Sequence, residues 1–139
     1  MAKLKDGYQT LISFTDDTSV VFYEKDVTPP GVSGGGEIDI TNMRNSTWRT
    51  KAPKSLVSLE PASLVVHYDP AAYVEIIAML NSNQLITITF PDASTIAFWG
   101  WIDAFTPSSL TEGEAPTADL TIIPSNLNGL DVETAPVIA

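Results

Sequence analysis

Residues 86–107 read ITITFPDASTIAFWGWIDAFTP, and this stretch decides the fold class. Within residues 85–90, apolar residues alternate with threonine, a period of two that is typical of a strand with one buried face. The segment 91–94, PDAS, has the composition of a tight turn. Residues 95–105 then return as a run rich in β-branched and aromatic residues, which favour strands. The sequence therefore predicts a β-hairpin here.

The return strand 95–105 is apolar on both of its faces. One face carries four apolar residues: Ile96, Phe98, Ile102 and Ala104. The opposite face, around Asp103, carries four more: Ala97, Trp99, Trp101 and Phe105. A surface strand of a small domain needs only one such face for its own core, so Trp99, Trp101 and Phe105 are predicted to form a subunit interface. The alternative is that a helix or a second sheet covers them.

One helix is predicted, at about residues 70–80. Asp69 is a good N-cap residue and Pro70 suits the first helical position. A stripe of apolar residues follows with helical spacing: Tyr73, Ile76, Ile77 and Leu80. A single short helix with one apolar stripe has to pack on a sheet to be stable.

Two further strands are predicted at 18–25 and 37–41. The second alternates, with Glu37, Asp39 and Thr41 on one side and isoleucines on the other, which predicts one wet face and one buried face. Between the two strands, residues 26–36 are predicted to be a long mobile loop without regular structure, since they hold two prolines and four glycines. These residues are Pro29, Pro30, Gly31, Gly34, Gly35 and Gly36.

The remaining strand signals lie at 9–14, at 55–67 with an interruption near Pro61, and at 118–123. The predicted fold class is mainly β: a β-sandwich or partly closed barrel with one flanking α-helix. Residues 1–124 are expected to form one domain, and residues 125–139 a C-terminal arm or disordered tail.

Charge is distributed unevenly along the 139 residues, whose net charge is −10. Every Lys and Arg lies at or before Lys54, and residues 55–139 hold ten acidic residues and no basic one. Such a chain repels DNA phosphates, because nucleic-acid binding depends on Lys and Arg. The sequence has no cysteine, no apolar run long enough for a membrane span and no apolar stretch typical of a secretory signal near its start.

No arrangement of residues indicates catalysis. His67 is the only histidine, no group of residues has metal-ligand spacing, and the triple glycine at 34–36 lacks the pattern of a phosphate loop. Any acidic β protein offers carboxylate pairs, so these carry no weight. We therefore expect no enzyme activity, no metal and no cofactor.

The order of these elements resembles the tail tube (major tail) proteins of long-tailed bacteriophages. The resemblance covers roughly residues 18–124: a strand hairpin with a Gly/Pro loop before 36–42, a helix opening at Asp69-Pro70, and the hairpin 86–107. It implies hexameric rings that stack into a tube around an acidic channel for genome passage. Some relatives carry an additional C-terminal immunoglobulin-like domain, which we do not expect after Ile123.

The resemblance also implies site residues and partners. Strands at about 18–25, 36–42, 85–90 and 95–105 would line the channel, and the loop 26–36 would reach the next ring. The implied lumen residues are Glu37, Asp39, Thr41, Thr87 and Thr89. The basic stretch with Arg44 and Arg49 would pair with an acidic face of the next subunit. Partners would be other copies, the tape measure and terminator proteins, and DNA as transient non-specific cargo, in a virion tail assembled in the host bacterial cytoplasm.

Two other classes stay open at this level. One is another virion component, such as a head–tail joining protein, or a secretion tube protein, which shares the logic of ring formation. The other is a monomeric carbohydrate- or protein-binding β-sandwich, in which Trp48, Trp99 and Trp101 would stack on sugar rings.

Overall fold

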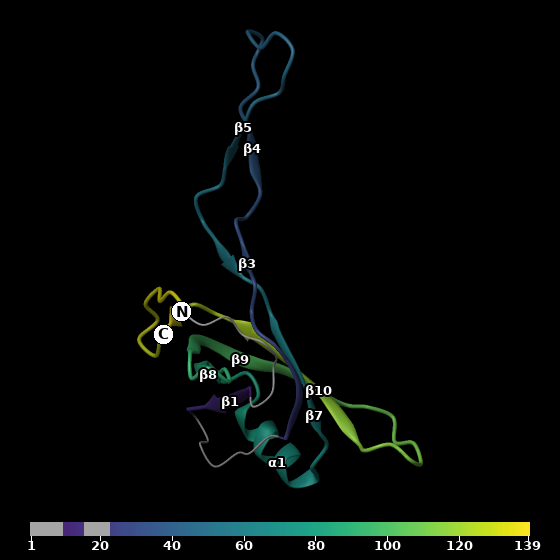
Figure 1. The fold of residues 1–139 in the computed structure, drawn as a ribbon. Coiled ribbons are helices and arrows are strands. Elements are labelled where there is room, and N and C mark those ends of the chain that lie inside the picture. Colours follow the sequence, from purple (N-terminus) through teal and green to yellow (C-terminus); the bar gives the residue numbers. More distant parts are fainter. Residues whose placement is uncertain (1–9, 16–22) are drawn as a thin grey trace.

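A single antiparallel sheet organises the computed structural model, which describes residues 10–15 and 23–139 (Figure 1). Its strands lie side by side in the order β1-β8-β9-β10-β7-β2, and β11 pairs with β9. Their bounds are β1 Leu11–Phe14, β2 Glu24–Thr28, β7 Ala62–His67, β8 Gln84–Thr89, β9 Thr95–Pro107, β10 Thr117–Pro124 and β11 Val137–Ile138. The predicted hairpin is confirmed as β8–β9, with Ile86 opposite Phe98 and Ile88 opposite Ile96.

The core lies between one face of this sheet and α1 (Pro70–Met79). Alternate residues of the central strands point into it, as the period of two predicts. Its fully enclosed members include Leu64, Ile86, Ile88, Phe98, Ile102, Leu120 and Ile122. Each such side chain contributes about 1.5–3 kcal/mol by leaving water, so this layer supplies most of the driving force for folding.

The helix begins as predicted, since the Asp69 side chain accepts a hydrogen bond from the Ala71 N–H and Pro70 occupies the first turn. The predicted stripe was wrong in part. The buried face of the helix consists of Ala72, Ile76 and Met79, whereas Ile77, which the predicted stripe includes, is 55% exposed. Every position of this helix after Pro70 is apolar except Glu75, so the apolar pattern fitted several faces and only packing on β9 selected one.

A β-bulge at Asp103 changes which residues of β9 share a face. Ala104 lies opposite Thr121, but Ile102 lies opposite Ile122, so β9 has one extra residue at this point. Phe105 therefore turns to the core side, where its ring packs on Tyr68 and Tyr73 with centroid separations of 6.4 Å and 5.3 Å. The predicted grouping of Phe105 with Trp99 and Trp101 was wrong for this reason.

A long hairpin, which we call the arm (residues 29–59), projects from the sheet (Figure 1). It contains two short ladders: β3 (Val32–Ser33) with β6 (Ser58–Leu59), and β4 (Glu37–Asp39) with β5 (Lys51–Pro53). The predicted break near Pro61 is confirmed, because β6 and β7 separate there. The prediction that residues 26–36 lack regular structure was wrong, because the loop includes the end of β2 and all of β3.

The alternation at 37–41 also has a different meaning from the one predicted. Ile38 and Ile40 are 47% and 52% exposed, so the expected buried face is absent. A two-stranded ribbon has no second layer that could bury either of its faces. The polar and apolar residues of 37–41 therefore alternate between two faces that are both exposed to solvent. The predicted strand at 18–25 lies largely outside the described residues, since only its end falls in β2.

Residues 125–139, which the sequence predicts as an arm or disordered tail, fold back along β9. β10 pairs with β9 only from Gly100 onward, which leaves the earlier edge of β9 unpaired on that side. The N–H groups of Ser125 and Asn126 donate to the Trp99 carbonyl at 2.8 Å and 3.4 Å, and Ala139 exchanges two backbone hydrogen bonds with Thr95. An open strand edge leaves backbone groups without partners, and this segment supplies them.

The mainly β class with one flanking helix is confirmed. The sheet stays open, with β1 and β2 at its two edges, and is not closed into a barrel. Among the helices of the described residues, none is both long enough and apolar enough to span a bilayer.

The close approach of β10 to Gly100 gives a stability test. A Cβ at this position would lie 2.6 Å from the Ile123 carbonyl oxygen and 3.1 Å from the Pro124 Cα, both backbone atoms that cannot rotate away. Gly100→Ala should therefore lower the free energy of unfolding by about 1–3 kcal/mol in urea denaturation. Gly34→Ala, where a Cβ meets nothing within 4 Å, is the control. Equal stability of the two variants would contradict this packing.

Candidate assembly surfaces

The face of the main sheet that points away from α1 is the first candidate surface. Across β2, β7, β10 and β9 it presents two rows of side chains. One row has three hydroxyls beside an alanine: Thr28, Ser63, Thr121 and Ala104. The next row consists of Asp26, Val65, Asp119 and Thr106. Further along the sheet, Ser13 lies beside Thr87, and Thr89 lies beside Thr95. We call the part of the face that these residues form the polar face; the remainder of the same face carries Leu11, Leu85, Trp99 and Trp101.

No Lys or Arg is among the paired residues of the polar face within the described part of the sheet. Every residue that is paired in the main sheet and turned away from the core is uncharged or acidic, apart from His67 at one end. Lys25 lies at the register shift of β2, where it has no paired residue. A shallow groove of about 280 Å³ runs over this face and is lined by Asp26 and Asp119 among the hydroxyls. The surface therefore combines carboxylates and hydroxyls without a group that binds phosphate.

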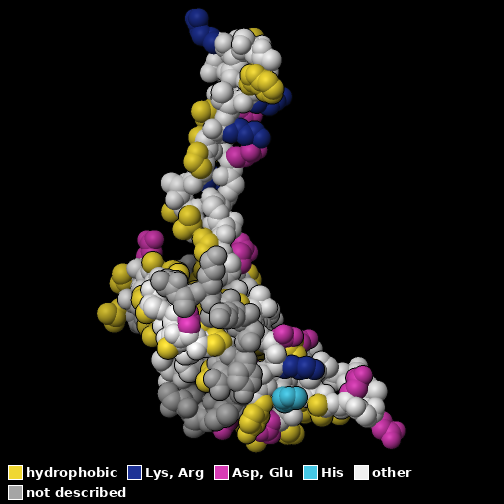
Figure 2. Space-filling view, in the orientation of Figure 1, with side chains coloured by type: hydrophobic (Ala, Val, Ile, Leu, Met, Phe, Trp, Pro, Cys, Tyr) yellow, Lys and Arg dark blue, Asp and Glu magenta, His cyan; other side chains and the backbone are white. Residues whose placement is uncertain are grey.

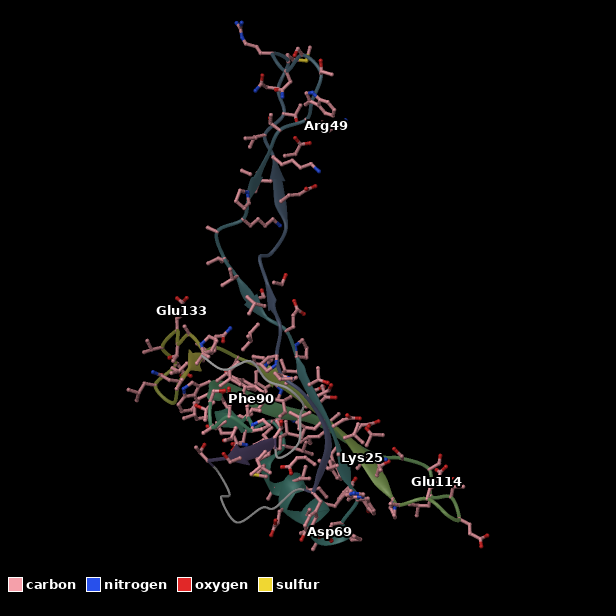
Figure 3. The ribbon with its side chains drawn as sticks, viewed as in Figure 1. Lys25, Arg49, Asp69, Phe90, Glu114 and Glu133 are labelled. Atoms are coloured by element: carbon pink, nitrogen blue, oxygen red, sulfur yellow. The ribbon has the colours of Figure 1, made fainter. Side chains whose placement is uncertain are left out.

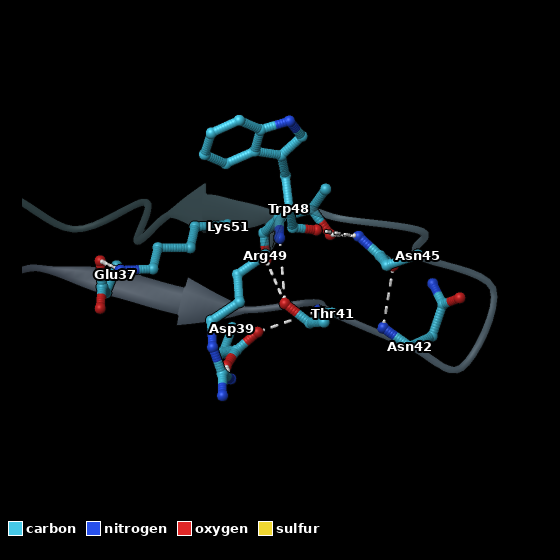
Figure 4. Close-up of polar contacts among 9 residues, drawn as sticks. Glu37, Asp39, Thr41, Asn42, Asn45, Trp48, Arg49 and Lys51 are labelled. Atoms are coloured by element: carbon cyan, nitrogen blue, oxygen red, sulfur yellow. Dashed lines mark hydrogen bonds and ion pairs between the residues drawn. The ribbon is translucent and has the colours of Figure 1, made fainter.

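The arm is the second candidate surface, and its two sides differ. On one side, Lys51 Nζ lies 2.9 Å from Glu37 Oε2, and Arg49 Nη1 lies 3.5 Å from Asp39 Oδ2 (Figure 4). On the other side, Ile38 lies opposite Ala52 and Ile40 continues the apolar strip. Because both ion pairs are exposed to solvent, they contribute little to stability.

The tip of the arm (residues 41–50) is organised by a hydrogen-bond network. Asn42 N–H donates to Asn45 Oδ1 at 3.1 Å, and Asn45 Nδ2 donates to the Trp48 carbonyl at 2.7 Å. Thr50 N–H donates to Thr41 Oγ1 at 3.0 Å. This network holds a turn without any apolar core, and the indole of Trp48 points away from it, on the side opposite the Asp39–Arg49 pair (Figure 4).

Hydrogen bonds also shift the pKa of the Asp39 carboxyl. The Thr41 side chain and the Thr41 N–H, which donates to Asp39 Oδ1 at 2.9 Å, lower the pKa of this carboxyl below its usual value. A lowered folded-state pKa means that the contribution to stability is present above the unfolded pKa and is lost as the pH falls through the folded one. Ser94 lowers the pKa of Asp92 in the β8–β9 turn in the same way.

The structure separates the five predicted lumen residues into two groups. Thr87 and Thr89 lie on the polar face of β8, half-buried beside Ala97 and Thr95. Glu37, Asp39 and Thr41 lie on the arm, where the two carboxylates pair with cations of the same chain. The carboxylates of the sheet itself, Asp26 and Asp119, were missed by the sequence analysis. The alternation of β10 could have indicated Asp119, since its neighbours Ala118 and Leu120 are fully buried.

The predicted interface residues are also distributed over different places. Trp99 and Trp101 are half-buried on β9, and Gly129 of the C-terminal segment approaches the Trp99 ring. Arg44 and Arg49 both lie on the arm. The predicted inter-ring residues of the 29–36 segment form the first limb of the arm and not its tip.

The described residues hold no group of three or more His, Asp or Glu side chains placed to bind a metal ion. Trp99 and Trp101 do not form an exposed platform for a sugar ring, because both are half-buried. Trp48 is exposed, but it is the one aromatic residue of the arm, residues 29–59. The polar face and the arm therefore remain the two candidate surfaces of the described residues.

Comparison with known proteins shows which solved structures share the fold of this chain. No protein-family model and no curated protein matches the sequence. A chain in the cryo-EM structure of the anti-feeding prophage baseplate, six-fold symmetrised, aligns with 100% of this chain and 97% of its own length, at 8% identity and a TM-score of 0.69. A chain in the virion of a native gene transfer agent particle aligns with 97% and 98%, at 12% identity and a TM-score of 0.62.

A chain in the tail of an empty gene transfer agent particle, computed with C6 symmetry, aligns over the same shares at 15% identity and a TM-score of 0.60. These identities are low, so the likeness shows the architecture. The protein has the fold of components of phage-derived tail particles. The match extends over nearly the whole length of each chain, so it includes the arm and the C-terminal segment as well as the sheet.

The hydrogen bond from Thr41 gives a test of the arm's geometry. Thr41→Val removes the hydroxyl, so the pKa of Asp39 should rise toward its usual value in a carboxyl-carbon NMR titration from about pH 2 to pH 6. Thr41→Ser keeps the hydroxyl and should retain the lowered pKa. Asp92 is the internal reference, since its hydrogen bonds come from Ser94. An unchanged Asp39 titration in Thr41→Val would contradict the contact.

Proposed function

We propose that this protein is a structural subunit of a phage tail tube, in which hexameric rings stack around an acidic channel for the genome. The observation that carries the proposal is the polar face, which presents hydroxyls, Asp26 and Asp119 but no Lys or Arg among its paired residues. DNA binds proteins mainly through cations that neutralise its phosphates. A channel lined by this face therefore lets a polyanion slide without holding it.

The open sheet supports ring formation. β2 is the last strand on one side of the sheet, and an edge strand leaves N–H and C=O groups that pair readily with another strand. A sheet continued from copy to copy closes only when the rotation between copies completes a circle. Two of the similar solved structures are described with six-fold or C6 symmetry, which is why we propose six subunits.

The lumen assignment follows the sheet. Thr87 and Thr89 remain lumen residues in this proposal, joined by Asp26, Asp119 and the hydroxyl row of the polar face. Glu37, Asp39 and Thr41 would instead act in contacts of the arm, since two of them are paired with arm cations. The arm, which includes most of the predicted 26–36 loop, would reach the next ring, and its length beyond the sheet supports that role (Figure 1).

The remaining expectations complete the proposal. The subunit would reside in the virion tail after assembly in the host cytoplasm, contact the tape measure and terminator proteins, carry DNA only as transient cargo, and have no enzymatic role. One of the similar structures is described as a baseplate, which favours a second candidate function. In it, the chain forms a single ring at a tail terminus, by the same sheet closure but without repeated stacking.

Charge reversal on the polar face tests the channel. Asp26→Lys with Asp119→Lys should leave tubes intact in negative-stain images, because both side chains point away from the core. Genome release should slow by about tenfold or more, since each ring gains two cations per subunit that hold phosphates. Asp92→Lys, in the β8–β9 turn, is the control. Unchanged DNA release from the double variant would refute the lumen assignment.

A further inference from the structure

The arm holds an unpartnered apolar surface. Seven large hydrophobic residues between 29 and 59 are substantially exposed: Val32, Ile38, Ile40, Met43, Trp48, Leu56 and Val57. Trp48 is 81% exposed and Met43 is completely exposed. Figure 2 shows these hydrophobic side chains along the arm, away from the body of the molecule. A series of exposed apolar side chains on a thin ribbon is typical of an interaction site, since a ribbon has no interior of its own.

The tip presents residues that are enriched in protein interfaces. Trp, Met and Arg are enriched in protein interfaces, and Trp and Arg often carry much of the binding energy. Here Met43, Arg44 and Trp48 lie within six residues of each other. The Asn42 side chain fixes the Arg44 backbone, accepting a hydrogen bond from its N–H at 2.9 Å. A tip that is already ordered loses little conformational entropy on binding.

Charge identifies the partner. The arm holds four cations and two carboxylates, which gives it a net charge of +2: Arg44, Arg49, Lys51 and Lys54 against Glu37 and Asp39. Because the whole chain has a net charge of −10, the residues outside the arm carry −12. Of the four cations, Arg49 and Lys51 are paired within the arm, which leaves Arg44 and Lys54 outside the ion pairs of the described residues. A cationic projection on an anionic body is complementary to another copy of the same chain.

The positions of the two surfaces allow a head-to-tail contact. Arg49 on the arm and Glu114 on the β9–β10 hairpin (residues 108–116) lie at opposite ends of the molecule (Figure 3). That hairpin tip exposes Leu110, Glu112 and Glu114. At the same end of the body, α1 exposes Val74 and Ile77, which are 69% and 55% accessible. A projection and an acceptor at opposite ends generate an interface that repeats along an axis.

We propose that the arm tip docks, through Trp48, Met43 and Arg44, on the end of a second copy formed by the β9–β10 hairpin and the exposed face of α1. Arg44 pairs with Glu112 or Glu114, and the indole covers apolar side chains such as Val74. This inference rests on the proposed function, since it assigns the contact that joins one ring to the next. It places the anchor at residues 43–48 and makes the Gly/Pro segment 29–36 a spacer.

Charge exchange between two variants tests the docking. One variant is Arg44→Glu, and the other is Glu112→Lys with Glu114→Lys. Each alone brings like charges together, so each should raise the concentration needed for assembly, measured by sedimentation and light scattering, at least about tenfold. An equimolar mixture should assemble near the wild-type concentration, because each arm then meets an opposite charge on the other variant. The three changes in one chain should also restore assembly.

Matched substitutions separate docking from folding. Trp48→Ala should weaken assembly about as much as Arg44→Glu, whereas Trp48→Phe and Arg44→Lys should retain most of it. All four side-chain changes lie at exposed positions, so thermal unfolding of the isolated subunit should be unchanged.

The outcomes distinguish this inference from the proposed function. Normal tubes from Arg44→Glu and Trp48→Ala would overturn the docking and leave the tube subunit standing. Impaired variants that the opposite charge change fails to rescue would also overturn it, and would indicate a different partner for the tip. A wild-type chain that stays monomeric at millimolar concentration would overturn both proposals.

Discussion

The pairing of β9 is the interaction on which the rest of the structure depends. This 13-residue strand bonds to β8 along one edge and to β10 and then β11 along the other, and it packs on α1. Its inward residues, Phe98 and Ile102, are essentially inaccessible. Gly100 lies between them, where β10 approaches so closely that a side chain has no space. The strand therefore fixes the register of its neighbours and the position of the helix.

The bulge at Asp103 has consequences on both sides of the sheet. It directs Phe105 inward to Tyr68 and Tyr73, which ties β9 to the start of the helix. It leaves Ala104 on the polar face beside Thr121. One extra residue in a strand reverses the facing of every residue after it. The core and the polar face are thus set by the same local feature.

The body and the arm follow different physical rules. The body buries one face of its sheet and is stable by its own packing, whereas the arm is a ribbon held by short ladders, two exposed ion pairs and the tip network. Such ribbons are marginal in water when isolated. Their apolar surface becomes an advantage only when another molecule covers it, so stable folding and assembly are assigned to separate parts of the chain.

The sequence by itself determined the local elements: the β8–β9 hairpin, the Asp69–Pro70 helix start, the break at Pro61 and the mainly β class. Each follows from residues adjacent in the chain, through period, capping and turn chemistry.

Which faces are buried, in contrast, depends on the tertiary structure. The alternation at 37–41 looks the same on a ribbon as on a layered sheet, and an almost wholly apolar helix has no unique inner stripe. A bulge is likewise invisible in composition, and the fate of residues 125–139 depended on an open edge of β9 created by distant strands. Burial is a relation between segments far apart in the chain, and no local pattern contains it.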